Sequence, residues 1–185
     1  MSVLTAPQRG TLENTVIRAR REAETGARNT LAALAVDQAE PFAHLSAAER
    51  ELRVRLRAKG RLLGDARAAD GRQPLHCLSN ELGYEYWHRM LFARFLEANN
   101  LLMYDNMSVT LEEVAELGPD DGYADKWTAA GAYASRMLPA IFRPEDPLLQ
   151  VSFAPDDRIA LESRLEGLEE TIFTLIITRA MEIVS

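Results

Sequence analysis

The sequence predicts an all-α fold, a multi-helix domain that begins with a pair of amphipathic helices. Three observations predict it. Apolar residues recur at spacings of three and four over residues 12–34, which is the helical period. Capping boxes pair Ser46 with Glu49 and Thr110 with Glu113. Residues 82–96 are apolar on almost every side of a helix, as in the buried centre of a larger assembly. Because 47% of the 185 residues are hydrophobic, a sizeable core is expected.

The first helix is predicted from an N-cap at Thr11 to about Val36. Its apolar stripe consists of Leu12, Val16, Ala19, Ala23, Ala27, Leu31 and Leu34. Four arginines lie off this stripe, at Arg18, Arg20, Arg21 and Arg28.

The second helix of the pair is predicted from the Ser46 capping box to about Leu63, with Gly64 as its stop. At 100° per residue, four arginines fall within about 80° of one another, and three leucines cluster opposite them. We therefore expect the helix to dock by its leucines and to present an arginine ridge outward as a candidate contact for the DNA backbone. The leucines are Leu52, Leu56 and Leu63, and the ridge is Arg50, Arg53, Arg57 and Arg61.

A linker is expected at residues 64–74, and the apolar helix follows it from about Leu75 to Asn99. The large side chains of this helix are candidates for packing or for docking to a partner: Trp87, Met90, Phe92 and Phe95. The aromatic run around them, which includes Tyr84 and Arg89, could stack bases, but its apolar surroundings favour a core element.

Shorter elements follow. Helices are predicted over residues 110–117 and 125–138, the latter with Trp127, Ala130, Tyr133, Ala134, Met137 and Leu138 inward, and from Asp156 or Asp157 to about Leu168. Residues 148–153 are expected to be extended, and residues 172–184 fit a helix or a strand equally well.

Charge divides the chain at the linker. Residues 1–72 carry 13 basic and 9 acidic side chains, and residues 73–185 carry 8 and 19, so the formal charges are +4 and −11. We predict a basic N-terminal helical segment, 1–72, and an acidic helical domain, 73–185. The basic segment could meet a phosphate backbone or, as we favour, the acidic part of its own chain.

Several classes of protein are excluded. The net charge of −7 does not suit a free-standing basic nucleic-acid binder, and one cysteine, Cys77, excludes a disulfide framework. No apolar run reaches the length of a membrane span, and no signal peptide is visible, so a cytoplasmic location is expected. Gly-x-Gly and Walker motifs are absent. We interpret His76, Cys77 and His88 as structural rather than metal-binding, and Glu112, Glu113 and Glu116 as cap residues.

One stretch of the sequence resembles a known protein family. Residues 84–102, YEYWHRMLFARFLEANNLL, resemble the N-terminal region of large adenine-specific DNA methyltransferases from phage-defence systems (BREX, PglX-like) and related fused restriction-modification enzymes. Further matches are residues 109–113, 134–147 and 161–162, and residues 42–46 with the arginine-rich helix resemble the family's first helical segment.

The resemblance implies transfer of a methyl group from S-adenosylmethionine to adenine N6, on a base rotated out of the duplex. In that family the cofactor motif and the Asn-Pro-Pro-Tyr motif lie far downstream, and this chain has no Asn-Pro or Pro-Pro. We therefore assign it no catalytic, cofactor-binding or metal-binding residue, and expect it to be inactive alone. The family pattern is lost from Thr174 onward, so a truncated or frameshifted product, or a fragment, is expected.

The resemblance thus predicts an N-terminal helical module that scaffolds the rest of the methyltransferase and contacts DNA. Two alternatives stay open. The chain could be a protein–protein docking module for the methyltransferase or another defence subunit, or it could be a non-functional degraded gene product. No membrane partner is expected.

Overall fold

The protein is mostly helical, as predicted. The computed structural model describes residues 6–139, 143 and 145–165, and the prediction for residues 172–184 lies outside them. The order of elements is α1 (Ala6–Ala33), α2 (Ala47–Leu63), α3 (His76–Ala98), β1 (Met103–Tyr104), β2 (Met107–Ser108), α4 (Leu111–Leu117), α5 (Lys126–Met137), the 3₁₀ helix η1 (Pro147–Gln150) and α7 (Pro155–Leu165).

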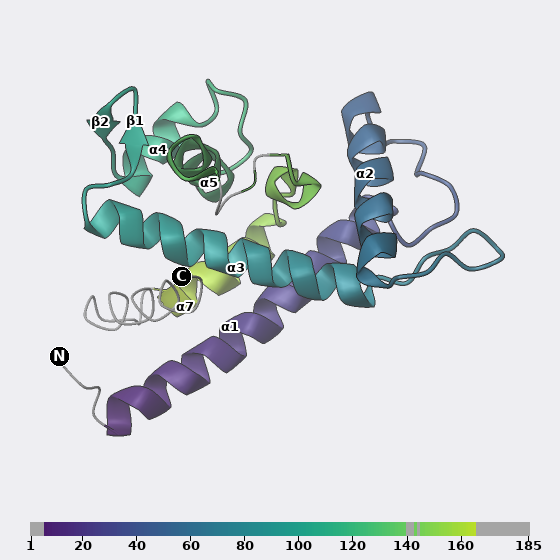
Figure 1. Ribbon diagram of the computed structural model, residues 1–185, viewed down its shortest axis with the longest axis horizontal. Coiled ribbons are helices and arrows are strands. Elements are labelled where there is room, and N and C mark those ends of the chain that lie inside the picture. The colour runs from purple at the N-terminus through teal and green to yellow at the C-terminus, as the bar shows by residue number, and fades with distance from the viewer. Residues whose placement is uncertain (1–5, 140–142, 144, 166–185) are drawn as a thin grey trace.

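Helix α3 is the centre of the fold (Figure 1). The long helix α1 crosses it on one side and also packs on α7, whereas α4 and α5 lie on the other side near the C-terminal end of α3. Helix α2 stands at the N-terminal end of α3 and contacts η1. The prediction that this helix forms the buried centre is confirmed in part: twelve of its 23 residues are buried, whereas Tyr84 is 64% exposed.

The contact between α1 and α3 depends on small residues. The buried stripe of α1 is formed by Ala19, Ala23, Ala27 and Leu31, whereas Val16 is 40% exposed. Opposite this stripe, α3 carries Gly83, whose backbone lies directly against the backbone of Ala23. Small side chains on both helices allow this approach, and the fold gains dispersion contacts along the crossing.

Both predicted capping boxes are present. The Ser46 hydroxyl accepts from the Glu49 N–H at 3.2 Å, and the Glu49 carboxylate accepts from the Ser46 N–H at 2.7 Å. The same reciprocal pair joins Thr110 and Glu113 at the start of α4. Helix α2 ends at Gly64, which has the positive φ of 116° that glycine adopts readily.

The predicted linker, residues 64–74, contains buried polar groups. The Asp65 carboxylate accepts from the backbone N–H groups of Cys77 at 3.0 Å and Leu78 at 2.8 Å, so it caps α3. The Gln73 side chain is also buried and donates to the carbonyl of Arg57. The linker therefore fixes the start of α3 against α2.

The sequence did not predict the hairpin of β1 and β2. Met103 pairs with Ser108 and Tyr104 with Met107, in antiparallel register. Asp105 and Asn106 form the turn, both with positive φ, as a two-residue hairpin requires.

The last described elements differ in part from expectation. Residues 148–153 were expected to be extended, but residues 147–150 form η1, because Pro147 and the Asp146 side chain, which accepts from the Leu148 N–H at 3.1 Å, start a helical turn. Val151, after η1, is extended. Helix α5 has the predicted range and is capped by Asp125, but Met137 at its end is exposed rather than inward.

One hydrophobic cluster includes residues from both sides of the predicted boundary at residue 72. It runs from Ala19 on α1 to Leu165 on α7, and Glu22 and Arg164 form an ion pair at 2.6 Å between these two helices. The boundary therefore stays a prediction that rests on composition and charge.

Replacement of Gly83 by alanine tests the helix crossing. A Cβ there would lie 3.0 Å from the backbone carbon of Ala23 and the backbone nitrogen of Glu24, so α1 has to shift. We expect the free energy of unfolding to fall by about 1–3 kcal/mol, measured by urea denaturation. Gly10→Ala is the matched control, because nothing lies within 4 Å of its Cβ position and alanine favours a helix. Equal stability of Gly83→Ala and wild type would contradict this packing.

Candidate functional site

The four arginines of the predicted ridge do not share one environment. Arg50 and Arg61 are exposed, whereas Arg53 and Arg57 are each only 6% exposed. The expectation of an outward ridge is therefore wrong for Arg53 and Arg57. Leu56 is buried as well. The buried face of α2 therefore contains Leu56 together with the two neighbouring arginines, Arg53 and Arg57.

Arg53 is bound by the segment that follows α1. Its Nε donates to the carbonyl of Ala35 at 2.9 Å, and its Nη2 donates to those of Gln38 at 2.7 Å and Ala39 at 3.1 Å. Burial lowers the pKa of Arg53, and hydrogen bonds to carbonyl oxygens offset part of that cost.

Arg57 joins the same segment to the linker before α3. Its Nη1 donates to the carbonyls of Val36, at 2.9 Å, and Gln38, and its Nη2 donates to that of Gly71 at 2.7 Å. Burial is also the main cause that lowers the pKa of Arg57. Neither Arg53 nor Arg57 forms an ion pair with a described residue, so their charges are held by backbone dipoles.

Arg50 and Arg61 stay on the surface. Arg50 donates to the carbonyls of Leu45 at 2.9 Å and Ala43 at 3.0 Å, and Arg61 makes one long hydrogen bond of 3.4 Å to Gln73. Of the predicted ridge, these two guanidinium groups are the ones that a phosphate could reach without unfolding α2.

The expected neutralisation of the basic segment by the acidic one is limited within the described residues. Lys59 on α2 pairs with Asp146 at 2.5 Å. The other ion pair between the two segments, Arg164 with Glu22, has its cation on the acidic segment. Most arginines of the basic segment therefore contact backbone carbonyls or solvent.

The predicted packing or docking residues lie largely in the core of this chain. Met90 is completely buried, Trp87 and Phe92 are less than a tenth exposed, and Phe95 is partly buried against them. They therefore pack within the fold.

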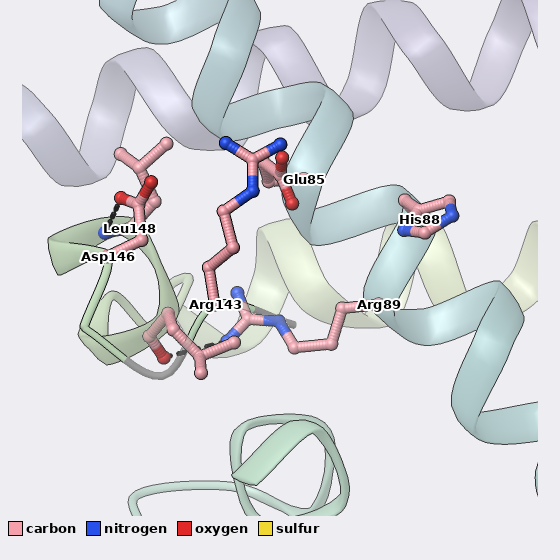
Figure 2. Close-up of a pocket in the computed structure, with 7 residues that line it drawn as sticks. Glu85, His88, Arg89, Arg143, Asp146 and Leu148 are labelled. Carbon is pink, nitrogen blue, oxygen red and sulfur yellow. Dashed lines mark hydrogen bonds between the residues drawn. The ribbon is translucent and has the colours of Figure 1, made fainter. Parts of the chain in front are cut away.

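A small pocket lies between α3 and η1 (Figure 2). It is lined by Glu85, His88, Arg89, Arg143, Asp146, Leu148 and Leu149. Figure 2 shows the Arg143 side chain extending toward Glu85. Burial raises the pKa of Glu85, against the effect of Arg143, and burial lowers the pKa of His88. The cavity volume of about 20 Å³ is enough for a water molecule.

Arg89 is the most buried cation at this pocket, with 2% exposure. Its Nη1 donates to the carbonyl of Leu149 at 2.9 Å and its Nη2 to that of Val151 at 3.4 Å, and its guanidinium lies 4.5 Å from the centre of the Tyr86 ring. Its Nε has no hydrogen-bond partner. Arg89 thus attaches η1 to α3 in the way that Arg53 attaches the loop after α1 to α2.

Sequence reasoning missed Asp65, Gln73 and the role of Arg89. Asp65 lies eleven residues before the first residue of the helix that it caps, outside the window in which a cap is sought. An isolated arginine within the apolar run of α3 was the one available signal for a buried cation. Within the described residues, no group of three or more His, Cys, Asp or Glu side chains could hold a metal ion.

Removal of the Arg57 guanidinium tests its structural role. Arg57→Met leaves the carbonyls of Val36 and Gly71 without this donor and removes one of the two donors to the carbonyl of Gln38, so we expect a loss of roughly 2–4 kcal/mol in the free energy of unfolding. Arg61→Met, one turn along α2 and exposed, should change it by less than about 0.5 kcal/mol. Urea denaturation of both variants measures this, and similar small effects would contradict the structural role of Arg57.

The pH dependence of stability tests the burial of Glu85. A carboxyl group whose pKa is raised in the folded state stabilises it at low pH, and this contribution is lost as pH rises through the folded pKa. Glu85→Gln stays neutral, so its stability relative to wild type should be higher at pH 7 than at pH 4 in urea denaturation. Glu112→Gln, at an exposed helix N-terminus where negative charge is favourable, should show no such gain. A pH-independent difference for Glu85→Gln would contradict the prediction.

Comparison with known proteins assigns no family. No protein-family model, curated protein or solved structure matches the chain. Among the described residues, none of the helices has the length and apolar character needed to cross a membrane. The resemblance of residues 84–102 to adenine-specific methyltransferases therefore stays a prediction.

Proposed function

We propose that this chain is a helical scaffolding module of an adenine-specific, S-adenosylmethionine-dependent DNA methyltransferase in a phage-defence or restriction-modification system. The observation that carries the proposal is the position of the resemblance. Residues 84–102 include most of α3, and α3 contacts α1, α2, α4, α5 and η1. The stretch that resembles the family is thus the one around which the fold is organised.

The chemistry of the chain's polar groups supports scaffolding rather than catalysis. Arg53, Arg57 and Arg89 are occupied by backbone carbonyls, and Asp65 and Asp125 cap helices. The small pocket beside Arg89 has room for water. Base extrusion and methyl transfer would take place in the downstream part of the enzyme, which would bind S-adenosylmethionine.

A docking role toward another defence subunit is favoured by a different observation. On α2, Val54 is 62% and Leu62 86% exposed, and residues eight apart lie on one side of a helix. An apolar strip on a helix that is otherwise rich in arginine fits the surface of a second protein. Binding through this strip would respond little to salt, because apolar burial is nearly independent of ionic strength.

The proposal predicts that the purified 185-residue chain transfers no methyl group. In a tritiated-methyl assay with S-adenosylmethionine and duplex DNA, incorporation should equal the background without protein, while an active adenine methyltransferase serves as the positive control. A cooperative thermal transition by circular dichroism would show that the inactive sample is folded. Clear incorporation by the chain alone would overturn the proposal.

A further inference from the structure

The outward face of α1 is basic. At 100° per residue, Arg18, Arg21 and Arg28 fall within about 80° of one another and opposite the buried stripe that starts at Ala19. All three side chains are exposed, and residues 18–28 extend over about 15 Å of helix. We call these three side chains the arginine face of α1.

The arginine face carries no acidic side chain. The two nearest glutamates project to the flanks of α1 and have other partners, since Glu22 pairs with Arg164 at 2.6 Å and Glu24 with Arg20 at 2.7 Å. Within the described part of the chain, Arg18, Arg21 and Arg28 form no ion pair. The described residues of the acidic segment therefore do not neutralise their charges through ion pairs.

Among the described residues, the acidic side chains lie in more than one place. Asp157 of α7 accepts from the Asn29 side chain of α1 at 3.2 Å, next to Arg28. The exposed glutamates Glu112, Glu113 and Glu116 are on α4, which lies across α3 from α1 (Figure 1). A polyanion that approached the arginine face would thus have the body of the fold between it and these like charges. On α2, by contrast, half of the predicted ridge is buried.

We propose that the arginine face of α1 binds the phosphate backbone of duplex DNA. Guanidinium groups match phosphate oxygens with paired N–H donors, and duplex DNA offers one negative charge per about 1.7 Å of its axis, so three arginines spread over 15 Å can each find a phosphate. The choice of DNA rests on the proposed function. The contact is to the backbone, so it positions the module on the duplex without reading sequence.

Binding of the full chain to a fluorescent duplex, measured by anisotropy from 50 to 200 mM salt, tests the proposal. The variant Arg18→Ala/Arg21→Ala/Arg28→Ala should bind more weakly at low salt, and the slope of log K against log salt should fall in magnitude by about 2.7. Wild-type affinity should therefore drop about 40-fold more than that of the variant over this range. Alanine favours helix, so α1 should stay folded, as circular dichroism would verify.

Two matched controls locate the contact. Arg20→Ala removes an exposed arginine of α1 that is paired with Glu24 and should leave the slope almost unchanged. Arg50→Ala/Arg61→Ala removes the exposed part of the ridge on α2 and should have less effect than the triple variant. An unchanged slope for the triple variant, or a larger effect of the α2 variant, would overturn the proposal.

Competition identifies the partner. Unlabelled duplex should displace the probe, whereas preferential displacement by single-stranded RNA or by vesicles containing phosphatidylserine would overturn the assignment to duplex DNA. The outcome is separable from that of the proposed function. If the chain alone transferred methyl groups and bound DNA through the arginine face, scaffolding would be contradicted and this inference would stand. If the chain transferred no methyl group and the triple variant bound DNA as wild type does, this inference would be contradicted and scaffolding would stand.

Discussion

Two buried guanidinium groups on α2 organise the N-terminal half of the fold. Arg53 and Arg57 each donate three hydrogen bonds to backbone carbonyls. Five of these six bonds are accepted by the segment that follows α1, and one is accepted by Gly71 before α3. A cation out of water is costly unless every N–H finds an acceptor. The path of the chain after α1, the position of α2 and the start of α3 therefore depend on one another, and the alanine and glycine contact between α1 and α3 extends that arrangement along the crossing.

This use of arginine changes what the charge of the basic segment means. A count of side chains treats Arg57 and Arg21 alike, yet one is inside the fold among carbonyls and the other is on the outer face of α1. Buried arginines such as Arg57 stabilise the fold, and exposed arginines such as Arg21 can contact a polyanion. The arginines that could act on a partner are thus the exposed ones, which include Arg18, Arg21 and Arg28 on α1 and Arg50 and Arg61 on α2.

The helices could be predicted from sequence because their signals are local. Ser46, Thr110 and Gly64 mark helix ends through contacts within a few residues, and the alanine stripe of α1 has a clear period. The burial of Arg53 could not be predicted, because its acceptors are carbonyls 14 to 18 residues away, and a carbonyl belongs to every residue and leaves no mark in a sequence. The hairpin at Asp105 is too short to show an alternating pattern. For the candidate site, the four positions of the ridge were found, but not which of them face solvent.

The short helix η1 is attached from two sides. Lys59 and Arg55 of α2 bind Asp146, Glu145 and Gln150, while Arg89 of α3 donates to Leu149 and Val151. If the tilt of α2 changed, η1 would move with it. The carbonyls of Leu149 and Val151 would then separate from the Arg89 guanidinium, which is buried. Besides the linker, residues 145–151 thus join α2 to α3 through side chains of both helices. A partner that moved α2 would therefore also displace this segment, which contacts the centre of the molecule.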